Sequence, residues 1–414
     1  RNQMTTNDTF EDGAPSGLCE HHIDAFLAHL RQAGYSEVTL GKKRRVLNAF
    51  SRWMRSRSVV LEHLDETDIA EFVKNPPGAR APYVRFKFSV LRLHLAYLRA
   101  ETLVREPLPK AEPEVDCIQR QYVEYLRQDR GLAENSVHVY APFIRDFLGS
   151  QNAGDGRISA HAFDAVTLRN YLLIHGKGRS GEYVRLLSTA LRSFCRFLFL
   201  HGDTVRDHSH FVPTVKTWRQ SSVPAFLLPE QGECILAATD RSTPTGRRDY
   251  AILLLLARLG LRAGEVVALE LGDIHWRSGE LVIHGKGQMV EHVPLLSDIG
   301  EALARYLYED RGASASRRVF LRMWAPHVGL TGPAAIGHIV RLAFARAGFR
   351  PSCRGAAHLF RHGLATTMIR HGASMAEIAE VLRHRSQDSS AIYAKVSFES
   401  LRGVARPWPT TGGA

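Results

Sequence analysis

The sequence has 414 residues, 44% hydrophobic and 23% charged, a composition typical of a globular protein with sizeable cores. No apolar stretch approaches the roughly 20 residues of a membrane-spanning helix, and the polar N-terminus lacks the apolar core of a secretion signal, so we expect a cytoplasmic protein. The formal net charge of +12 favours a polyanionic partner, and five scattered cysteines without a CxxC pair argue against a disulfide framework or a zinc site.

The first predicted unit is a helical bundle over residues 18–104, preceded by a polar stretch, residues 1–17, that we expect to be a disordered tail. Apolar side chains near its start recur at the spacing of one buried helix face, at Ile23, Phe26, Leu27 and Leu30. Similar patterns continue to Leu98, and the breaker at Asn75-Pro76-Pro77-Gly78 divides them. These patterns predict about four helices. Because the chain begins with Arg1, we expect translation to start at Met4 or upstream.

A second helical bundle is predicted over residues 114–205, after a Pro-rich, charged linker. Its pattern resembles that of the first unit, because each has an apolar helix, a glycine turn (Gly34 or Gly131) and a second helix that ends in aromatic residues. We interpret the two units as related bundles in tandem. The alternative is that any two helical bundles look alike at this level.

A larger C-terminal domain is predicted over residues 225–405, followed by a short tail at 406–414. Its long apolar helix pattern, Arg247 to Val267, is interrupted at Gly260. Three strand-like runs follow, and Gly285-Lys286-Gly287 forms the expected hairpin tip between the second and the third; the runs are Asp273 to Trp276, Glu280 to His284 and Glu291 to Leu295. The predicted fold is therefore mainly α with a small antiparallel β-sheet.

Basic residues in this domain have the chemistry needed to break a phosphodiester. That reaction needs a nucleophile, cations for the non-bridging oxygens and an acid for the leaving oxygen. His358 and Arg361 are three residues apart, so on a helix they share a face, and a guanidinium matches phosphate oxygens bidentately. Taken alone, an HxxRH string is a weak signal, because the chain has 20 histidines and many arginines.

Four further residues complete the candidate set, and a fifth, Glu265, supports one of them. Arg262 lies at the glycine-interrupted helix junction, where Glu265, three residues later, could orient its guanidinium. Lys286 at the hairpin tip is either a solvated turn residue or a cation that reaches DNA. His384 and Tyr393 lie nine residues apart near the C-terminus. A tyrosine with a free pKa of about 10 needs neighbouring cations to become a nucleophile, and otherwise it is a packing residue.

In this order, the residues resemble the tyrosine recombinase (phage integrase) family. The shared pattern is an Arg in a G-L-R-x-x-E box, a Lys in a hairpin, an H-x-x-R box, and L-x-H followed by a Tyr. Residues 247–269 look like the first box and residues 358–396 like the second. The similarity is strong over 225–405, and residues 114–205 resemble the core-binding domain more loosely. The resemblance implies two tandem SAM-like helical bundles before a mixed α+β catalytic domain.

The resemblance also implies a role for each candidate residue. Arg262 and Arg361 would bind the scissile phosphate, Lys286 would protonate the leaving 5′ oxygen, and His358 would assist proton transfer. His384 would hydrogen-bond the phosphate, Glu265 would support the site, and Tyr393 would form a 3′-phosphotyrosyl link. That link stores the bond energy, so neither a cofactor nor a metal is implied. The chain departs from the family at Arg383, where a small Gly is usual.

The implied partner is double-stranded DNA, held in a C-shaped clamp by a homo-tetramer or by a mixed assembly with related recombinases, on the bacterial nucleoid. Basic helical faces of the first bundle fit this picture, although each residue could equally belong to a solvated surface. The residues concerned are Lys42, Lys43, Arg44 and Arg45, with Arg80, Arg85, Lys87 and Arg92.

The function that we expect is site-specific recombination of the integration, excision or transposition type, as in a mobile element. One alternative is a type IB topoisomerase-like enzyme that nicks and recloses one duplex. The other is a catalytically silent DNA-binding partner of other recombinases, but a silent descendant has no chemical reason to keep all six candidate positions.

Overall fold

The computed structural model describes residues 20–74, 81–106, 113–151, 158, 163–215, 225–285, 289–350 and 355–383. Three large, separate hydrophobic cores lie within these residues, one in each of an N-terminal bundle, a middle bundle and a C-terminal domain. Residues Glu106–Ser221, which contain the middle bundle, form a compact unit of their own. Among the described helices, none is both long and apolar enough to cross a membrane.

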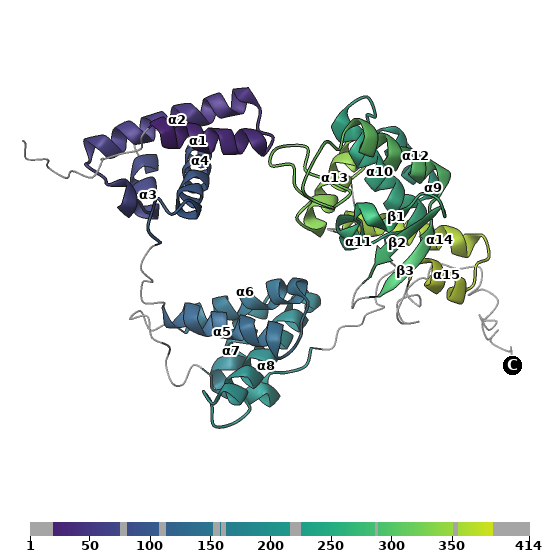
Figure 1. Ribbon diagram of the computed structural model, residues 1–414. Helices are drawn as coiled ribbons and strands as arrows, with labels where there is room; N and C mark the ends of the chain where they lie inside the picture. The colour runs from purple at the N-terminus through teal and green to yellow at the C-terminus, as the bar shows by residue number, and fades with distance from the viewer. Residues whose placement is uncertain are drawn as a thin grey trace, which may run out of the picture. The chain divides into compact units, whose positions relative to one another are not determined.

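The N-terminal bundle consists of four helices in its described part (Figure 1). Ser36 caps the second helix, because its hydroxyl accepts a hydrogen bond from the Thr39 amide. The apolar stripe foreseen from Ile23 to Leu30 is buried, with Phe26 fully enclosed by the fourth helix. The helices are α1 (Glu20–Gln32), α2 (Glu37–Ser56), α3 (Glu66–Lys74) and α4 (Ala81–Ala100).

A buried histidine makes this bundle sensitive to acid. His94 of α4 is 1% exposed, its ring lies 4.7 Å from that of Phe26, and its Nε2 has no hydrogen-bond partner among the described residues. Burial, assisted by the nearby His22, lowers the pKa of His94 to about 3. The folded bundle therefore keeps His94 neutral, whereas the unfolded chain takes up a proton below about pH 6.5.

We expect the stability of the chain to fall as the pH drops from about 6.5 towards about 3, by roughly 1 kcal/mol per pH unit from His94. His94→Leu removes this proton uptake and should flatten the dependence. The urea midpoint at pH 7 and pH 5 measures the effect, with His63→Leu at an exposed position as the control. An unchanged pH dependence in His94→Leu would assign the sensitivity to another group, such as His362.

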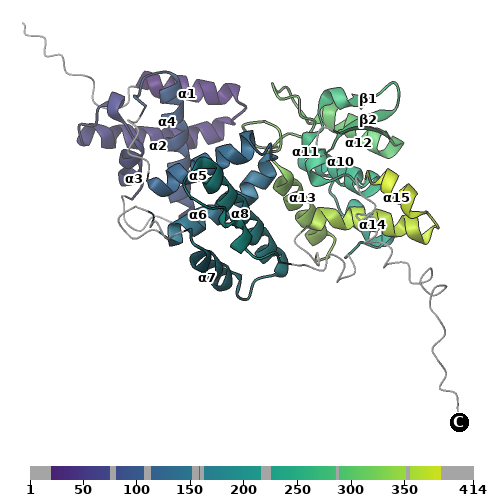
Figure 2. The same ribbon diagram turned by 90° about the horizontal axis from the view of Figure 1, so that it is seen from below.

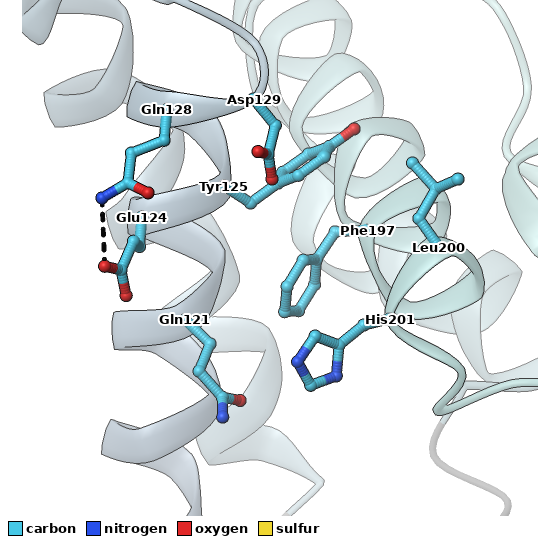
Figure 3. Close-up of a pocket in the computed structure, with 8 residues that line it drawn as sticks. All are labelled: Gln121, Glu124, Tyr125, Gln128, Asp129, Phe197, Leu200 and His201. Carbon is cyan, nitrogen blue, oxygen red and sulfur yellow. Dashed lines mark hydrogen bonds between the residues drawn. The ribbon is translucent and has the colours of Figure 1, made fainter.

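The middle bundle has an aromatic core. The ring of Phe194 makes edge contacts with Tyr122 and Phe147, and all three are buried. A hollow of about 300 Å³ lies between the first and last helices and is floored by Tyr125 and Phe197 (Figure 3). Carboxylates of Glu124 and Asp129 line it, so it is unfavourable for a phosphate. The helices are α5 (Glu114–Gln128), α6 (Glu134–Ser150), α7 (Ala165–Gly176) and α8 (Gly181–His201).

The C-terminal domain is built around one central helix, α10 (Pro244–Leu259), shown among its neighbours in Figures 1 and 2. Every residue from Ala251 to Leu256 is buried, because five other helices of the domain pack against α10. The other helices are α9 (Pro229–Ala237), α11 (Ala263–Ala268), α12 (Ser297–Glu309), α13 (Pro333–Arg346), α14 (Ala356–Arg370) and α15 (Met375–Val381).

The sheet of this domain has three antiparallel strands in the order β1-β2-β3. Alternation puts Leu281, Ile283 and Val293 into the core and the intervening side chains on the outer face. The strands are β1 (Ile274–His275), β2 (Glu280–His284) and β3 (Val290–Pro294). The predicted fold class, mainly α with a small antiparallel sheet, is confirmed. The domain boundaries and the relatedness of the two bundles stay predictions.

Candidate active site

A glycine turn between α10 and α11 is the foundation of the site. Gly260 has a left-handed backbone, with φ of +57°. A Cβ added there would lie 2.8 Å from Cδ2 of Leu382 and 3.1 Å from Cδ2 of Leu364. Both the conformation and the close approach therefore require glycine. The turn ends α10 and leaves Arg262 as the N-cap residue of α11.

Glu265 fixes Arg262 in place. Its Oε2 accepts the backbone N–H of Arg262 at 2.8 Å, which satisfies an amide at the helix start, and its Oε1 lies 2.5 Å from Nη1 of Arg262. The carboxylate is 5% exposed, whereas the Arg262 side chain is 38% exposed. The three-residue spacing thus produces a held but solvent-accessible guanidinium.

Arg361 of α14 is buried, with 4% exposure, and it holds two parts of the chain together. Its Nη1 donates to the carbonyl of Gly260 at 2.6 Å, and its Nη2 donates to the carbonyl of Leu382. The other arginine reaches the same segment, because Nη2 of Arg262 donates to the carbonyl of Arg383 at 3.2 Å. Arg262 and Arg361, which are far apart in sequence, therefore bind the carbonyls of two consecutive residues. These two residues directly precede His384 in the sequence.

Arg383, the departure from the family that adds charge beside the site, contacts the residues described above. Its φ is +55°, a left-handed conformation that explains why glycine suits this position and that costs about 1–2 kcal/mol for a residue with a Cβ. The side chain is 7% exposed and lies 3.4 Å from Oε2 of Glu265 and 3.6 Å from Oε2 of Glu291 on β3. Arg383 thus connects the strand β3 to the Arg262–Glu265 pair.

The histidines of α14 are held neutral. Burial lowers the pKa of His358 below its ordinary value, and the positive charges of Arg361 and Arg262 lower it further, although part of the ring remains exposed. Burial, with His358 and Arg361, lowers the pKa of His362 to about 4. Near neutral pH the His358 imidazole can therefore accept a proton.

Three predicted residues lie outside the described residues, namely Lys286, His384 and Tyr393. The described chain reaches Gly285 on one side of the hairpin tip and resumes at Met289, and it ends at Arg383. The structure therefore brings together Arg262, Glu265, Arg361 and His358, and the places of the other three stay predictions.

The basic residues of α2 do not form one surface. Lys43 is 6% exposed, and its ammonium lies 5.0 Å from the ring centre of Tyr35 and 5.9 Å from that of Phe86. Arg44 pairs with Asp24 at 2.5 Å, and Lys42 and Arg45 are exposed. The structure thus corrects the expectation that Lys43 faces DNA, because it belongs to the interior of the bundle.

The same correction applies to α4. Lys87 is 7% exposed, with its ammonium 4.9 Å from the ring centre of Tyr83 and 5.1 Å from that of Phe72. Arg85 and Arg92 of the same helix are exposed, and Arg80 lies outside the described residues. Of the described basic residues predicted for this bundle, Lys42, Arg45, Arg85 and Arg92 are exposed and could contact a polyanion.

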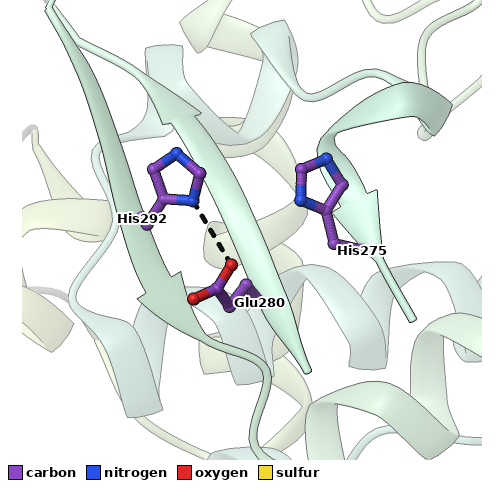
Figure 4. Close-up of side chains that lie close together, drawn as sticks. All are labelled: His275, Glu280 and His292. Carbon is purple, nitrogen blue, oxygen red and sulfur yellow. Dashed lines mark hydrogen bonds and ion pairs between the residues drawn. The ribbon is translucent and has the colours of Figure 1, made fainter. Parts of the chain in front are cut away.

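A separate group of residues with the chemistry of metal ligands lies on the sheet and does not include Arg262, Arg361 or Arg383. Within the described part of the chain, His275, Glu280 and His292 form the one group of at least three such residues whose ligand atoms lie within 4.8 Å of one another. They occupy the outer face of the sheet (Figure 4), whereas Glu291, which contacts Arg383, alternates to the inner face with Val293.

Comparison with known proteins identifies the family. Residues 225–400 match the phage integrase family. The y4rA protein of Sinorhizobium fredii, described as an integrase/recombinase, is 38% identical over 400 residues, which are 95% of this chain and 96% of the relative. The chain belongs to the phage integrase family of tyrosine recombinases.

More distant tyrosine recombinases agree with this placement. The tyrosine recombinase XerC of Bacillus pumilus is 27% identical over 68% of this chain and 92% of its own. The crystal structure of the XerH site-specific recombinase bound to palindromic difH, a post-cleavage complex, shares the fold with a TM-score of 0.54 and 19% identity, covering 74% of this chain and all of that one. As a tyrosine recombinase, the chain is a site-specific recombinase that transfers DNA strands.

One charged residue at the site of this tyrosine recombinase, Glu291, was not predicted from the sequence, and neither was its contact with Arg383. Arg383 and Glu291 belong to separate segments that meet only in the fold, so no local spacing could have paired them. The positive φ of Arg383 had a sequence signal, because the family usually has glycine there. The signal for Glu291 was weaker, being only a carboxylate at an inward position of a predicted strand.

Proposed function

We propose that this tyrosine recombinase cuts and rejoins DNA through Tyr393, with Arg262 and Arg361 as the cations that bind the scissile phosphate. The observation that carries the proposal is that both guanidinium groups bond to the consecutive carbonyls of Leu382 and Arg383. This contact brings the two predicted phosphate ligands to the segment that leads into His384 and Tyr393.

In the proposed reaction, the phenolate oxygen of Tyr393 attacks phosphorus, and the bond from phosphorus to the 5′ oxygen breaks. Lys286 gives its proton to the leaving 5′ oxygen, and neutral His358 assists proton transfer by accepting the proton that the Tyr393 hydroxyl loses. Arg262, Arg361 and His384 stabilise the charge on the non-bridging oxygens. Attack by a 5′ hydroxyl on the 3′-phosphotyrosyl link reverses these steps and reseals a strand.

The DNA-bound assembly belongs to the same proposal. The XerH structure is a complex with its difH substrate. We infer that double-stranded DNA is likewise the partner of this chain, and that two sites are joined in a homo-tetramer or in a mixed assembly with related recombinases. Lys42 and Arg45 of the N-terminal bundle, both exposed, would add phosphate contacts. Action on chromosomal DNA would place the protein at the nucleoid, in the cytoplasm.

A nicked duplex that traps the cleaved strand tests the nucleophile. Duplexes taken from the DNA that flanks the gene serve as the candidate sites. We expect a covalent protein–DNA complex with the wild-type chain and none with Tyr393→Phe, whereas Tyr308→Phe, a change at a 93% exposed tyrosine, should leave it intact. A complex that persists in Tyr393→Phe would show that another residue is the nucleophile.

The products distinguish recombination from a topoisomerase reaction. With two sites on separate duplexes, a recombinase yields exchanged strands. A type IB topoisomerase-like enzyme only relaxes a supercoiled circle and exchanges nothing. Covalent trapping with relaxation but without exchange between any pair of flanking sites would favour the second activity.

A further inference from the structure

The outer face of the small sheet carries a group of ligand-type side chains, one from each strand. His275 of β1 lies directly opposite Glu280 of β2, and His292 of β3 pairs with Val282, two residues along β2 from Glu280. Alternation along the strands puts all three on the face away from the core (Figure 4). A paired sheet is a rigid support, so their relative positions are set by backbone hydrogen bonds.

The distances suit a small divalent cation. Nδ1 of His292 lies 3.4 Å from Oε2 of Glu280, close to the separation of about 3.3 Å between two ligands bonded at about 2.0–2.1 Å to a tetrahedral Zn²⁺. The ligand atoms of all three residues lie within 4.8 Å of one another, and the two imidazole ring centres are 6.2 Å apart.

The carboxylate has support from a neighbouring side chain. The hydroxyl of Ser278, in the turn between β1 and β2, donates to Oε2 of Glu280 at 3.4 Å. Such outer contacts orient metal ligands. Two imidazoles and one carboxylate are the donors that Zn²⁺ accepts, whereas Ca²⁺ and Mg²⁺ prefer sets made of oxygen alone.

We propose that His275, Glu280 and His292 bind one Zn²⁺ ion, which bridges the three strands of the sheet. Exposure of both histidines leaves the remaining coordination position to water. The ion would have a structural role and take no part in strand transfer, because its ligands lie on the outer face of the sheet and Glu291, which contacts Arg383, lies on the inner face. Its effect would be to stabilise the hairpin strands β2 and β3, which flank the tip that contains Lys286 in the sequence.

Titration of the tag-free, full-length chain with Co²⁺ as a spectroscopic substitute for Zn²⁺ tests the proposal. We expect visible absorption that saturates at one equivalent per chain and is displaced by Zn²⁺. The absorption should disappear in His275→Ala and in His292→Ala, and Glu280→Gln should weaken binding by tenfold or more, since about this loss already follows from outer-contact changes. Zn²⁺ should also raise the midpoint of thermal unfolding of the wild-type chain, but not that of His275→Ala or His292→Ala.

The matched control is His284→Ala. His284 lies on the same sheet and pairs with Asp273, its Nε2 being 3.0 Å from Oδ1, but it does not belong to the group of three. This variant should bind Co²⁺ like the wild type, and circular dichroism should show that every variant is folded. The proposal is overturned if the wild type gives no saturable absorption. It is also overturned if absorption survives in the His275→Ala/His292→Ala double variant or is lost equally in His284→Ala.

Discussion

Arg361→Lys is expected to lower the rate of strand cleavage by about 10²–10³-fold, the loss that follows removal of one preorganised donor from a charged transition state. The guanidinium bonds to the carbonyls of Gly260 and Leu382 through two different nitrogens. A lysine has a single nitrogen and cannot reproduce this planar bridge while also contacting a phosphate. Single-turnover cleavage of the nicked duplex measures the effect, together with DNA affinity.

The same substitution should reduce stability, because it leaves at least one buried carbonyl without its donor, at about 1–3 kcal/mol. Cleavage must therefore be compared at a temperature where circular dichroism shows the variant to be folded. Arg258→Lys is the control, since Arg258 also lies on a helix of this domain but pairs with Glu233 and Asp298. If the folded Arg361→Lys variant cleaved DNA at the wild-type rate, Arg361 would have no role in the reaction.

Glu265→Ala should have the largest effect on stability, about 3–5 kcal/mol, because it removes the carboxylate from a buried group of charges. The change leaves the amide of Arg262 without its acceptor and deprives both Arg262 and Arg383 of their common counter-charge. We also expect cleavage to fall by about 10–100-fold, as for loss of residues that orient a catalytic group. Urea unfolding and single-turnover cleavage measure the two losses.

Glu265→Gln separates shape from charge, because its amide oxygen can still accept the Arg262 N–H. We expect it to recover part of the stability but little of the cleavage. Arg383→Gly should be less harmful in the Glu265→Ala background than alone, since it removes one of the two cations that lose the Glu265 counter-charge and relieves the left-handed backbone. Glu233→Ala is the control for loss of a carboxylate that pairs with an arginine. Strict additivity of the Glu265 and Arg383 changes would contradict the coupling.

Local patterns were sufficient for much of the fold. The interruption at Gly260 was visible because glycine ends a helix by adopting positive φ, and the structure ends α10 there. The second strand, Glu280 to His284, was predicted to the residue. The Arg262–Glu265 contact followed from a spacing of three at a helix start. Each of these features is decided within one turn or one hairpin.

Lys43 shows a signal that was present but misjudged. Four consecutive basic residues on a helix point in different directions, about 100° apart, so they cannot share one face. Lys43 falls on the stripe of Leu40, Leu47 and Phe50, which is the buried face of α2. Periodicity therefore predicted its burial, and the run of positive charge obscured it. The Arg383–Glu291 contact had no such signal, because it depends on how the sheet packs against the segment after α15.

The bonds of Arg361 to two carbonyls change how this arginine should be interpreted in other copies of the gene. A related protein that has lost strand-transfer activity still needs Arg361 to join the Gly260 turn to Leu382. Selection for a folded, DNA-bound protein would therefore preserve this arginine. Its retention is therefore no test of whether a relative is an enzyme. In inactive relatives, substitutions should accumulate first at residues without a structural role. A survey of such sequences should find Arg361 among the last residues to be substituted.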